Sequence, residues 1–203
     1  RIIDCHTHVM WYPDHLSEQY AGEALASKLV KLKRSGGLAY SAKLDKHCWR
    51  LPAGTQGPVT LRYTVYAWDL SVRSAHLDQT HGFFNGTSVF LAAHGHEASP
   101  HRVDIRPPGG LEDAHWRVAT SLPEAAGERG AAERYGFGLY HADNYDDLID
   151  HPVEMGTFTL GEFDACGVLH AVAITGRHDC DMGRLLADLK LVCERQRSAE
   201  RRV

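Results

Sequence analysis

Two histidines near the N-terminus are the first residues whose types and spacing could do chemistry. Residues 2–8 read IIDCHTH, so His6 and His8 lie one residue apart at the end of a β-branched run. Residues i and i+2 of an extended chain point to the same side, and two imidazoles can share one divalent metal ion. His15 is the nearest further ligand. Without a third ligand the site is incomplete, because a catalytic zinc takes three protein ligands and a water.

Other reactive side chains have ordinary structural interpretations beside the chemical ones. HADNYDDLID (141–150) lacks the glycine and closing glutamate of a calcium loop, and an acidic helical turn N-capped by Asp143 explains it. His178–Asp181 precedes a helix, where aspartates are favoured. Cys166 and His170 could form a nucleophile pair, but nothing orients the imidazole. His94–Glu97 reads as a loop.

The elements that would position these residues differ between the two parts of the chain. The first 46 residues predict a strand at Arg1–Asp4 and a helix from about Ser17 to Arg34, where Leu25, Leu29 and Leu32 recur with helical spacing. Gly36 and Gly37 would end that helix. This order is one β/α unit.

From His47 onward the patterns indicate strands separated by turns. Residues 59–70 alternate apolar and polar side chains. The other predicted strands are Thr87–Ala92, His101–Arg106, Trp116–Ser121, Gly136–His141, Gly156–Leu160 and Val168–Thr175. A stripe through Met182, Leu186 and Leu189 predicts a C-terminal helix with Asp179 or Asp181 as N-cap. We therefore predict a mainly β fold, an antiparallel sandwich or saddle-like sheet, with a C-terminal helix and an N-terminal β/α fragment.

Composition narrows the class of protein. The 203 residues carry a formal charge of −4, with 43% hydrophobic and 24% charged residues, which favours a globular protein without a nucleic-acid partner. No apolar run approaches about 18 residues, and the N-terminus lacks a signal-peptide pattern, so no membrane partner is expected. Five cysteines without a C-x-x-C pair predict free thiols and a cytoplasmic location.

Residues 1–46, with IIDCHTHVMWYPDHLSEQY, resemble the opening of the amidohydrolase superfamily, the branch that includes decarboxylases. That resemblance implies a (β/α)₈ barrel in which His6 and His8 are metal ligands. A barrel of this kind needs about 250 residues of alternating strands and helices, and the alternation stops after Lys46. The pair is therefore read as the remnant of an incomplete site. A metal-dependent hydrolase using His6 and His8 stays the alternative.

Residues 45–196 are similar to the N-terminal domain of the glycyl aminopeptidase family, PDZ-containing zinc metallopeptidases. The motifs are DKHCWRL (45–51), LRYTVYAWDLSVRSAHLD (61–78), FFNGTSVFL (83–91), WRVATSLP (116–123), YDDLIDHPVEMG (145–156) and ITGRHDCDMGRLLADLK (174–190). The resemblance implies an all-β domain packed beside a zinc catalytic domain, which would be the partner and would bind the peptide substrate.

The zinc-binding motif of such peptidases, H-E-x-x-H on a helix, does not occur in these 203 residues. We therefore expect no catalytic residue and no cofactor in this chain. In the intact enzyme, Glu154 could hold the α-ammonium of a peptide. Alternatively, its carboxylate pairs with an arginine inside the sheet.

The two resemblances meet at AKLD (42–45), which suggests a recombined or artificial chimera. We predict three segments: an amidohydrolase-like fragment (1–46), an aminopeptidase N-terminal-like β domain (47–178), and a helix with a basic tail (179–203). The predicted function is a scaffold domain that shapes the substrate cleft of a zinc aminopeptidase and is inactive alone. The surface that meets the catalytic domain should be apolar and exposed.

Overall fold

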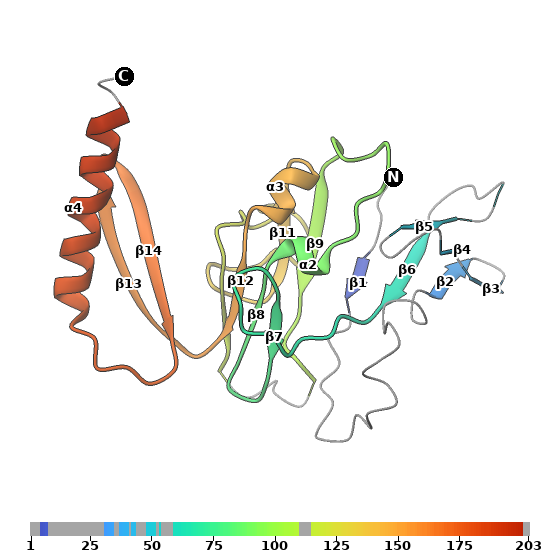
Figure 1. Ribbon diagram of the computed structural model, residues 1–203, viewed down its shortest axis with the longest axis horizontal. Coiled ribbons are helices and arrows are strands. Elements are labelled where there is room, and N and C mark those ends of the chain that lie inside the picture. The colour runs from blue at the N-terminus through green and yellow to red at the C-terminus, as the bar shows by residue number, and fades with distance from the viewer. Residues whose placement is uncertain are drawn as a thin grey trace. The chain divides into compact units, whose positions relative to one another are not determined.

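The computed structural model describes residues 5–7, 31–34, 37–40, 42–43, 48–51, 53, 59–109 and 115–200. The chain divides into two compact units, Arg1–Met155 and Gly156–Val203 (Figure 1). The last two predicted strands lie in the second unit together with the C-terminal helix. The predicted division into 1–46, 47–178 and 179–203 stays a prediction.

The first unit begins with a four-stranded sheet. Its strands, in spatial order, are β1 (Cys5–Thr7), β6 (Thr60–Tyr63), β2 (Lys31–Arg34) and β3 (Gly37–Tyr40). β1 runs parallel to β6, whereas β2 is antiparallel to both β6 and β3. A separate short pair joins β4 (Ala42–Lys43) to β5 (Trp49–Arg50). Strands from within the first 46 residues thus share a sheet with β6.

The predicted helix over Ser17–Arg34 is wrong at its C-terminal end, because Lys31–Arg34 forms strand β2. Leu32 lies opposite Leu61 in one neighbouring strand and Ala39 in the other. Pairing on both sides outweighs the helical spacing of the leucines, since tertiary context overrides local propensity. The remainder of that helix and the predicted strand Arg1–Asp4 lie outside the described residues.

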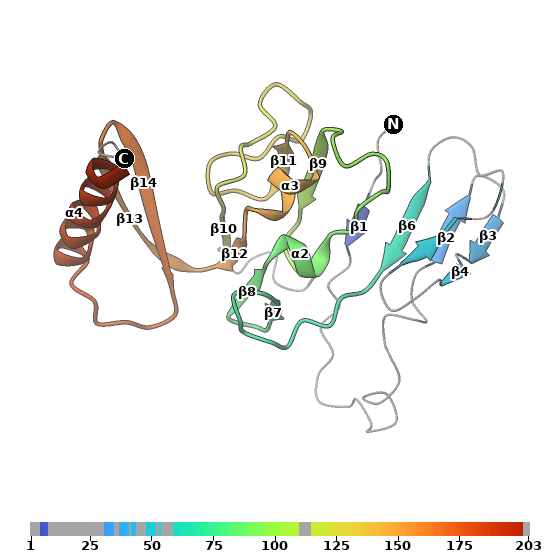
Figure 2. The ribbon, with the colours of Figure 1, turned by 45° about the horizontal axis from the view of Figure 1, so that its top comes forward.

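A second four-stranded sheet and a two-stranded sheet complete the first unit. The second sheet has the order β10 (Arg117–Ala119), β12 (Val153–Gly156), β8 (His81–Phe84) and β7 (Ala75–Leu77). The two-stranded sheet pairs β9 (His101–Ile105) with β11 (Gly138–Ala142). Two short helices, α2 (Gly86–Val89) and α3 (Tyr145–Ile149), lie close together in both ribbon views (Figures 1 and 2).

The predicted strands at 101–106, 116–121 and 136–141 are confirmed within a few residues by β9, β10 and β11. The prediction for Thr87–Ala92 is wrong, because α2 occupies its first residues. Asn85 caps this helix: its side-chain oxygen accepts hydrogen bonds from the Thr87 N–H at 3.0 Å and the Thr87 hydroxyl at 2.6 Å. A capping asparagine starts a helical turn in spite of the β-branched residues that follow.

The core of the first unit lies between these sheets and helices. The most deeply buried side chains are Tyr140, Leu122, Val118 and Val153. They pack with Phe84, Val89, Ile105, Leu148 and Met155, among others. The Tyr140 hydroxyl donates to the Gly136 carbonyl at 2.5 Å, and burial, reinforced by the charge of Glu124, raises the pKa of Tyr140 to about 12. This core fixes the strands that present the polar groups described below.

The second unit is a hairpin covered by a helix. β13 (Phe158–Ala165) pairs with β14 (Val168–Thr175), and α4 (Met182–Glu200) packs against β13 (Figure 2). Gly161 makes room for Leu186, since an added Cβ would lie 2.9 Å from its Cδ1 atom. Asp181 is confirmed as an N-cap, because its side chain accepts from the Arg184 N–H at 3.1 Å.

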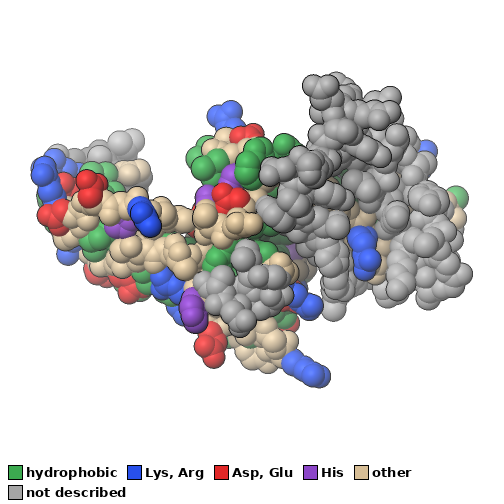
Figure 3. Space-filling model, turned by 90° about the horizontal axis from the view of Figure 1, so that it is seen from below, with side chains coloured by type: hydrophobic (Ala, Val, Ile, Leu, Met, Phe, Trp, Pro, Cys, Tyr) green, Lys and Arg blue, Asp and Glu red, His purple; other side chains and the backbone are tan. Residues whose placement is uncertain are grey.

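The predicted fold class is confirmed: the described residues form mainly strands in open, mostly antiparallel sheets, with a C-terminal helix. Apolar side chains are visible at the surface of both units, between charged ones (Figure 3). Among the described residues, none of the helices has the length and apolar character needed to span a bilayer.

Candidate functional site

Three side chains of types that can bind a metal ion lie together on the hairpin formed by β7 and β8. His76 lies within β7, Asp78 follows this strand, and His81 begins β8. The turn is closed by the Asp78 N–H, which donates to the His81 carbonyl at 3.0 Å. One ligand atom from each side chain lies within 4.8 Å of the other two. The sequence HLDQTH (76–81) therefore brings two imidazoles and a carboxylate together through a tight turn.

The carboxylate of Asp78 is held by both of its oxygens. Oδ1 accepts hydrogen bonds from the Thr80 N–H and hydroxyl, both at 2.7 Å, and from the His81 N–H at 3.0 Å. Oδ2 lies 3.2 Å from Nε2 of His76. Partial burial disfavours the charged form, but the hydrogen bonds from Thr80, His81 and His76 outweigh it and hold the pKa of Asp78 far below its usual range. Asp78 therefore presents a fixed negative charge.

Glu154 approaches the same hairpin from β12, the neighbour of β8. Its Oε1 lies 2.9 Å from Nδ1 of His81, and both side chains are largely buried. The sequence offered either a substrate's ammonium or an arginine as the partner of this carboxylate. The structure shows His81 as one partner of this carboxylate, which no sequence pattern indicated. Pairing with an arginine stays a prediction. The substrate-binding role of Glu154 stays a prediction.

An exposed row of apolar side chains borders the cluster. The segment before β7 runs alongside it, with Trp68 paired to His76 and the Asp69 N–H donating to Ala75 at 3.0 Å. Val65 and Ala67 face the core. The alternating large side chains in residues 66–72 are 57 to 76% exposed: Tyr66, Trp68, Leu70 and Val72. We call these four residues the 66–72 stripe. The first unit therefore carries exposed apolar side chains, and their contact with a catalytic domain stays a prediction.

Ring stacking connects this stripe to the histidines. The ring of Trp68 stacks on that of His76 with centroids 5.2 Å apart. The rings of His76 and His81 stack in turn at 5.0 Å. The column shields His76, whose side chain is 11% exposed. Both imidazoles are thereby held in one orientation.

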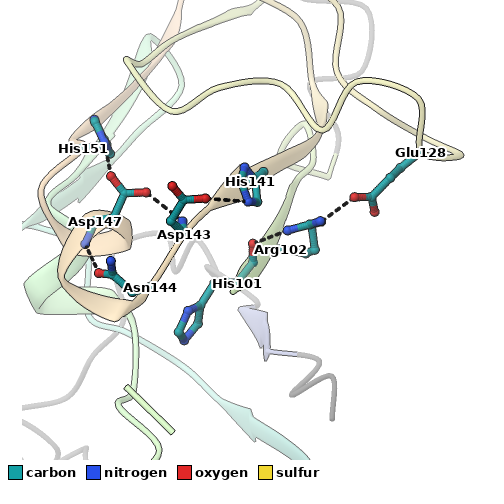
Figure 4. A network of polar contacts seen from close by, with 8 residues as sticks. All are labelled: His101, Arg102, Glu128, His141, Asp143, Asn144, Asp147 and His151. Atoms are coloured by element: carbon teal, nitrogen blue, oxygen red, sulfur yellow. Dashed lines mark hydrogen bonds and ion pairs between the residues drawn. The ribbon is translucent and has the colours of Figure 1, made fainter. Parts of the chain in front are cut away.

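A second polar network surrounds α3 (Figure 4). Asn144 caps this helix, accepting from the Asp147 N–H at 2.9 Å. The prediction that Asp143 is the cap is wrong, although the acidic helical turn itself is confirmed. The backbone N–H of Asp143 instead donates to Asp147 at 2.8 Å, and this bond, with a hydrogen bond from His151, lowers the pKa of Asp147.

Ser121, His151 and Asp147 are joined in series, with contacts of 2.6 Å from Ser121 Oγ to His151 Nδ1 and 3.1 Å from His151 Nε2 to Asp147 Oδ1. These residue types also form nucleophilic triads. Acyl transfer requires donors for the developing oxyanion as well, and the contacts themselves only tie the loop after β10 to α3. We interpret the series as structural.

Among the residues that the structure describes, no further pair of predicted site residues comes together. His6 lies in β1 opposite Arg62, and its partner His8 lies outside the described residues. The metal pair therefore stays a prediction. His170 stacks on Phe163 at 4.9 Å and its Nδ1 contacts the Val168 carbonyl, whereas Cys166 lies in the exposed turn.

The remaining histidine motifs have structural partners. His178 contacts the Thr159 hydroxyl at 2.9 Å, at the start of the loop into α4. His94 and Glu97 lie 3.5 Å apart in a turn, as the loop interpretation predicted.

Sequence reasoning missed His76, Asp78 and His81. Their signal is H-x-D-x-x-H: residues 76 and 78 share one strand face, and a two-residue turn returns the chain to place residue 81 beside them. Neither β7 nor β8 was predicted, so the turn between them was not recognised.

Comparisons with known proteins give a matching family and a similar solved structure. Residues 6–157 match the peptidase M61 N-terminal domain. The chain is also 41% identical, with a TM-score of 0.75, to an aminopeptidase N family protein from Idiomarina loihiensis that is known from a crystal structure. That similarity covers 83% of this chain but only 27% of the other, so the chain spans about a quarter of that relative. No curated protein matches the chain. The family match begins inside the segment that resembles the amidohydrolase superfamily, and that resemblance stays a prediction.

Proposed function

The chain belongs to the peptidase M61 N-terminal domain family, and we propose that it is the non-catalytic scaffold domain of a glycyl-aminopeptidase-like zinc metallopeptidase. The observation that carries the proposal is the match over residues 6–157, in a sequence that contains no H-E-x-x-H. The residues present do not fit the catalytic zinc of such a peptidase. Zinc, water activation and peptide cleavage are therefore assigned to a separate catalytic domain, the proposed partner.

The 66–72 stripe supports contact with that partner. Large apolar side chains that remain exposed on a folded domain mark interaction surfaces, and Trp and Tyr are enriched at the centres of such surfaces. The segment is anchored to β7 by backbone hydrogen bonds. We propose that the catalytic domain covers this stripe, so that the scaffold domain shapes one wall of the substrate cleft. The cytoplasmic location predicted from the cysteines remains part of the proposal.

A domain replacement tests the proposal. The region of the Idiomarina loihiensis protein that matches this chain is exchanged for residues 6–157, and hydrolysis of aminoacyl anilides is measured. We expect the hybrid to keep activity within about tenfold of the parent, because about 1.4 kcal/mol of altered docking corresponds to one such factor.

A variant pair makes the test specific to the stripe. Trp68→Ser with Leu70→Ser should separate the domains and lower activity by more than about tenfold, since central aromatic contacts carry most of the energy of an interface. Arg129→Ser, at another exposed position, is the matched control and should leave activity unchanged. A folded, zinc-containing hybrid without activity, or a stripe variant as active as its control, would refute the proposal.

The alternative is a metal-dependent, amidohydrolase-like or decarboxylase-like hydrolase that uses His6 and His8. It stays a prediction, and a His6→Ala/His8→Ala variant separates the two functions. Loss of a metal-dependent activity in that variant supports the alternative, whereas the scaffold function does not require either side chain.

A further inference from the structure

We propose that His76, Asp78 and His81 bind a divalent transition metal ion of the zinc class. This site is separate from the H-E-x-x-H zinc of the catalytic partner, and it does not depend on the proposed docking. The three side chains offer two imidazole nitrogens and one carboxylate oxygen within 4.8 Å of one another. Imidazoles with a carboxylate suit zinc and its neighbours, whereas calcium and magnesium prefer oxygen ligands alone.

The backbone brings the ligands together before any metal arrives. Leu77 pairs with Gly82 across the hairpin, and the Asp78 N–H bonds to the His81 carbonyl. His76 and Asp78 are two residues apart and share one face of the chain. A site built on a short, hydrogen-bonded turn loses little conformational entropy on binding.

Asp78 is prepared as a ligand by its own hydrogen bonds. Oδ1 accepts three N–H or O–H donors from Thr80 and His81, which fixes the plane of the carboxylate. Oδ2 is directed at Nε2 of His76, 3.2 Å away. Two ligand atoms of one zinc ion lie about 3.3 Å apart when the bonds are about 2.0 Å long and the geometry is tetrahedral. The Asp78–His76 separation already has that value.

Glu154 orients the third ligand. Its Oε1 lies 2.9 Å from Nδ1 of His81, and a hydrogen on Nδ1 leaves the lone pair of Nε2 available for a metal. Histidine ligands of zinc characteristically donate their other ring N–H to a carboxylate in this way. Glu154 is therefore a positioning residue, because its contact with Nδ1 of His81 orients the ring so that Nε2 can bind the metal ion.

Burial and charge favour an ion at this place. The side chains of His76 and His81 are 11 and 16% exposed, and Trp68 stacks on the former. The carboxylates of Asp78 and Glu154 supply negative charge beside the two imidazoles. Three protein ligands leave a further position for water or for a group from a partner.

Zinc titration of the purified 203-residue chain tests the proposal. Isothermal calorimetry at pH 7.5 should show one site with a dissociation constant below about 10 µM, roughly −7 kcal/mol. His76→Ala and His81→Ala should each weaken that site by at least about 100-fold, because two ligands hold zinc poorly. His178→Ala, at an exposed histidine outside the cluster, is the matched control and should leave the affinity unchanged.

Two further measurements distinguish loss of the metal site from misfolding, and this site from zinc binding at other histidines. Glu154→Gln preserves the shape of the side chain and should weaken binding by roughly 10- to 100-fold, the usual effect of removing such a carboxylate. Cobalt substituted for zinc should give the visible absorption of a site with nitrogen and oxygen ligands. Zinc binding that survives the loss of His76 and His81, that disappears in His6→Ala/His8→Ala, or that is absent altogether would overturn the proposal, while leaving the scaffold function untouched.

Discussion

At the scale of single residues, burial changes the pKa of His101. His101 begins β9 (Figure 4). Its ring lies 6.0 Å from that of Tyr145, and its buried Nδ1 atom has no hydrogen-bond partner among the described residues. Burial lowers the pKa of His101 from its usual value of 6.5, against an opposing hydrogen bond with Ser99. The folded protein therefore favours the neutral form of this imidazole more than the unfolded chain does.

This lowered pKa predicts the direction of a pH effect on stability. A base with a depressed folded-state pKa contributes stability above about pH 6.5, and that contribution is lost as the pH falls through the folded-state pKa, because the unfolded chain binds the proton more readily. Urea unfolding at pH 7.5 and 5.5 should show a smaller loss of stability for His101→Gln than for the unchanged chain. His94→Gln, on an exposed turn, is the control. Equal losses in all three proteins would contradict this account.

The chemistry of single residues could be predicted only in part. Asp181 was one of two candidate N-caps, because an aspartate just before a predicted helix is a signal in the local sequence. Glu154 was selected as a functional carboxylate, and that role stays a prediction. Its partner His81 lies 73 positions away, and no local pattern specifies a contact between β8 and β12. The metal-ligand cluster was missed for the same reason: it requires knowledge of the turn, not only of the residue types.

At the scale of the elements, α2 packs closely against α3 at Gly86. An added Cβ at Gly86 would lie 2.8 Å from the Cα atom of Ile149 and 3.2 Å from the Leu148 carbonyl. Both neighbours are backbone atoms of α3, so neither helix can accommodate the methyl group by a rotamer change. Small-residue packing thus sets the distance between the two helices.

Gly86→Ala should therefore destabilise the first unit by about 1–3 kcal/mol, the usual cost of overpacking. Chemical denaturation measures the change. Gly109→Ala is the matched control, because an added Cβ there meets nothing within 4 Å, and its effect should stay within about 0.5 kcal/mol. Equal effects of the two substitutions would show that the helices are not in close contact.

Elements were predictable where alternation extends over a full strand. β14 was predicted with its observed bounds, and β9 within one residue. The short strands β7, β8 and β12 were not predicted, since three or four residues carry little periodicity. β2 was assigned to a helix because its leucines fit helical spacing, while its two strand partners come from distant sequence.

At the scale of the whole molecule, the strands of the first unit join the N-terminal segment to the rest. β1 and β2 both pair with β6. The family match runs from residue 6 to residue 157 and so includes residue 45, near which the two resemblances meet. The aminopeptidase resemblance was visible in the sequence because several long motifs occur in order. The family match also covers residues 6–44, where the sequence resembles a different family, and that second resemblance stays a prediction.

The scaffold function is tested by measuring the aminopeptidase activity of the purified 203-residue chain. Release of anilide from aminoacyl anilides is measured with one equivalent of zinc, and again after addition of a chelator. We expect bound zinc at His76, Asp78 and His81 but no hydrolysis above the buffer rate, because the proposed function assigns peptide cleavage to a separate domain. Turnover that zinc supports and the chelator removes would show that this chain carries a catalytic centre of its own, and would contradict the scaffold function.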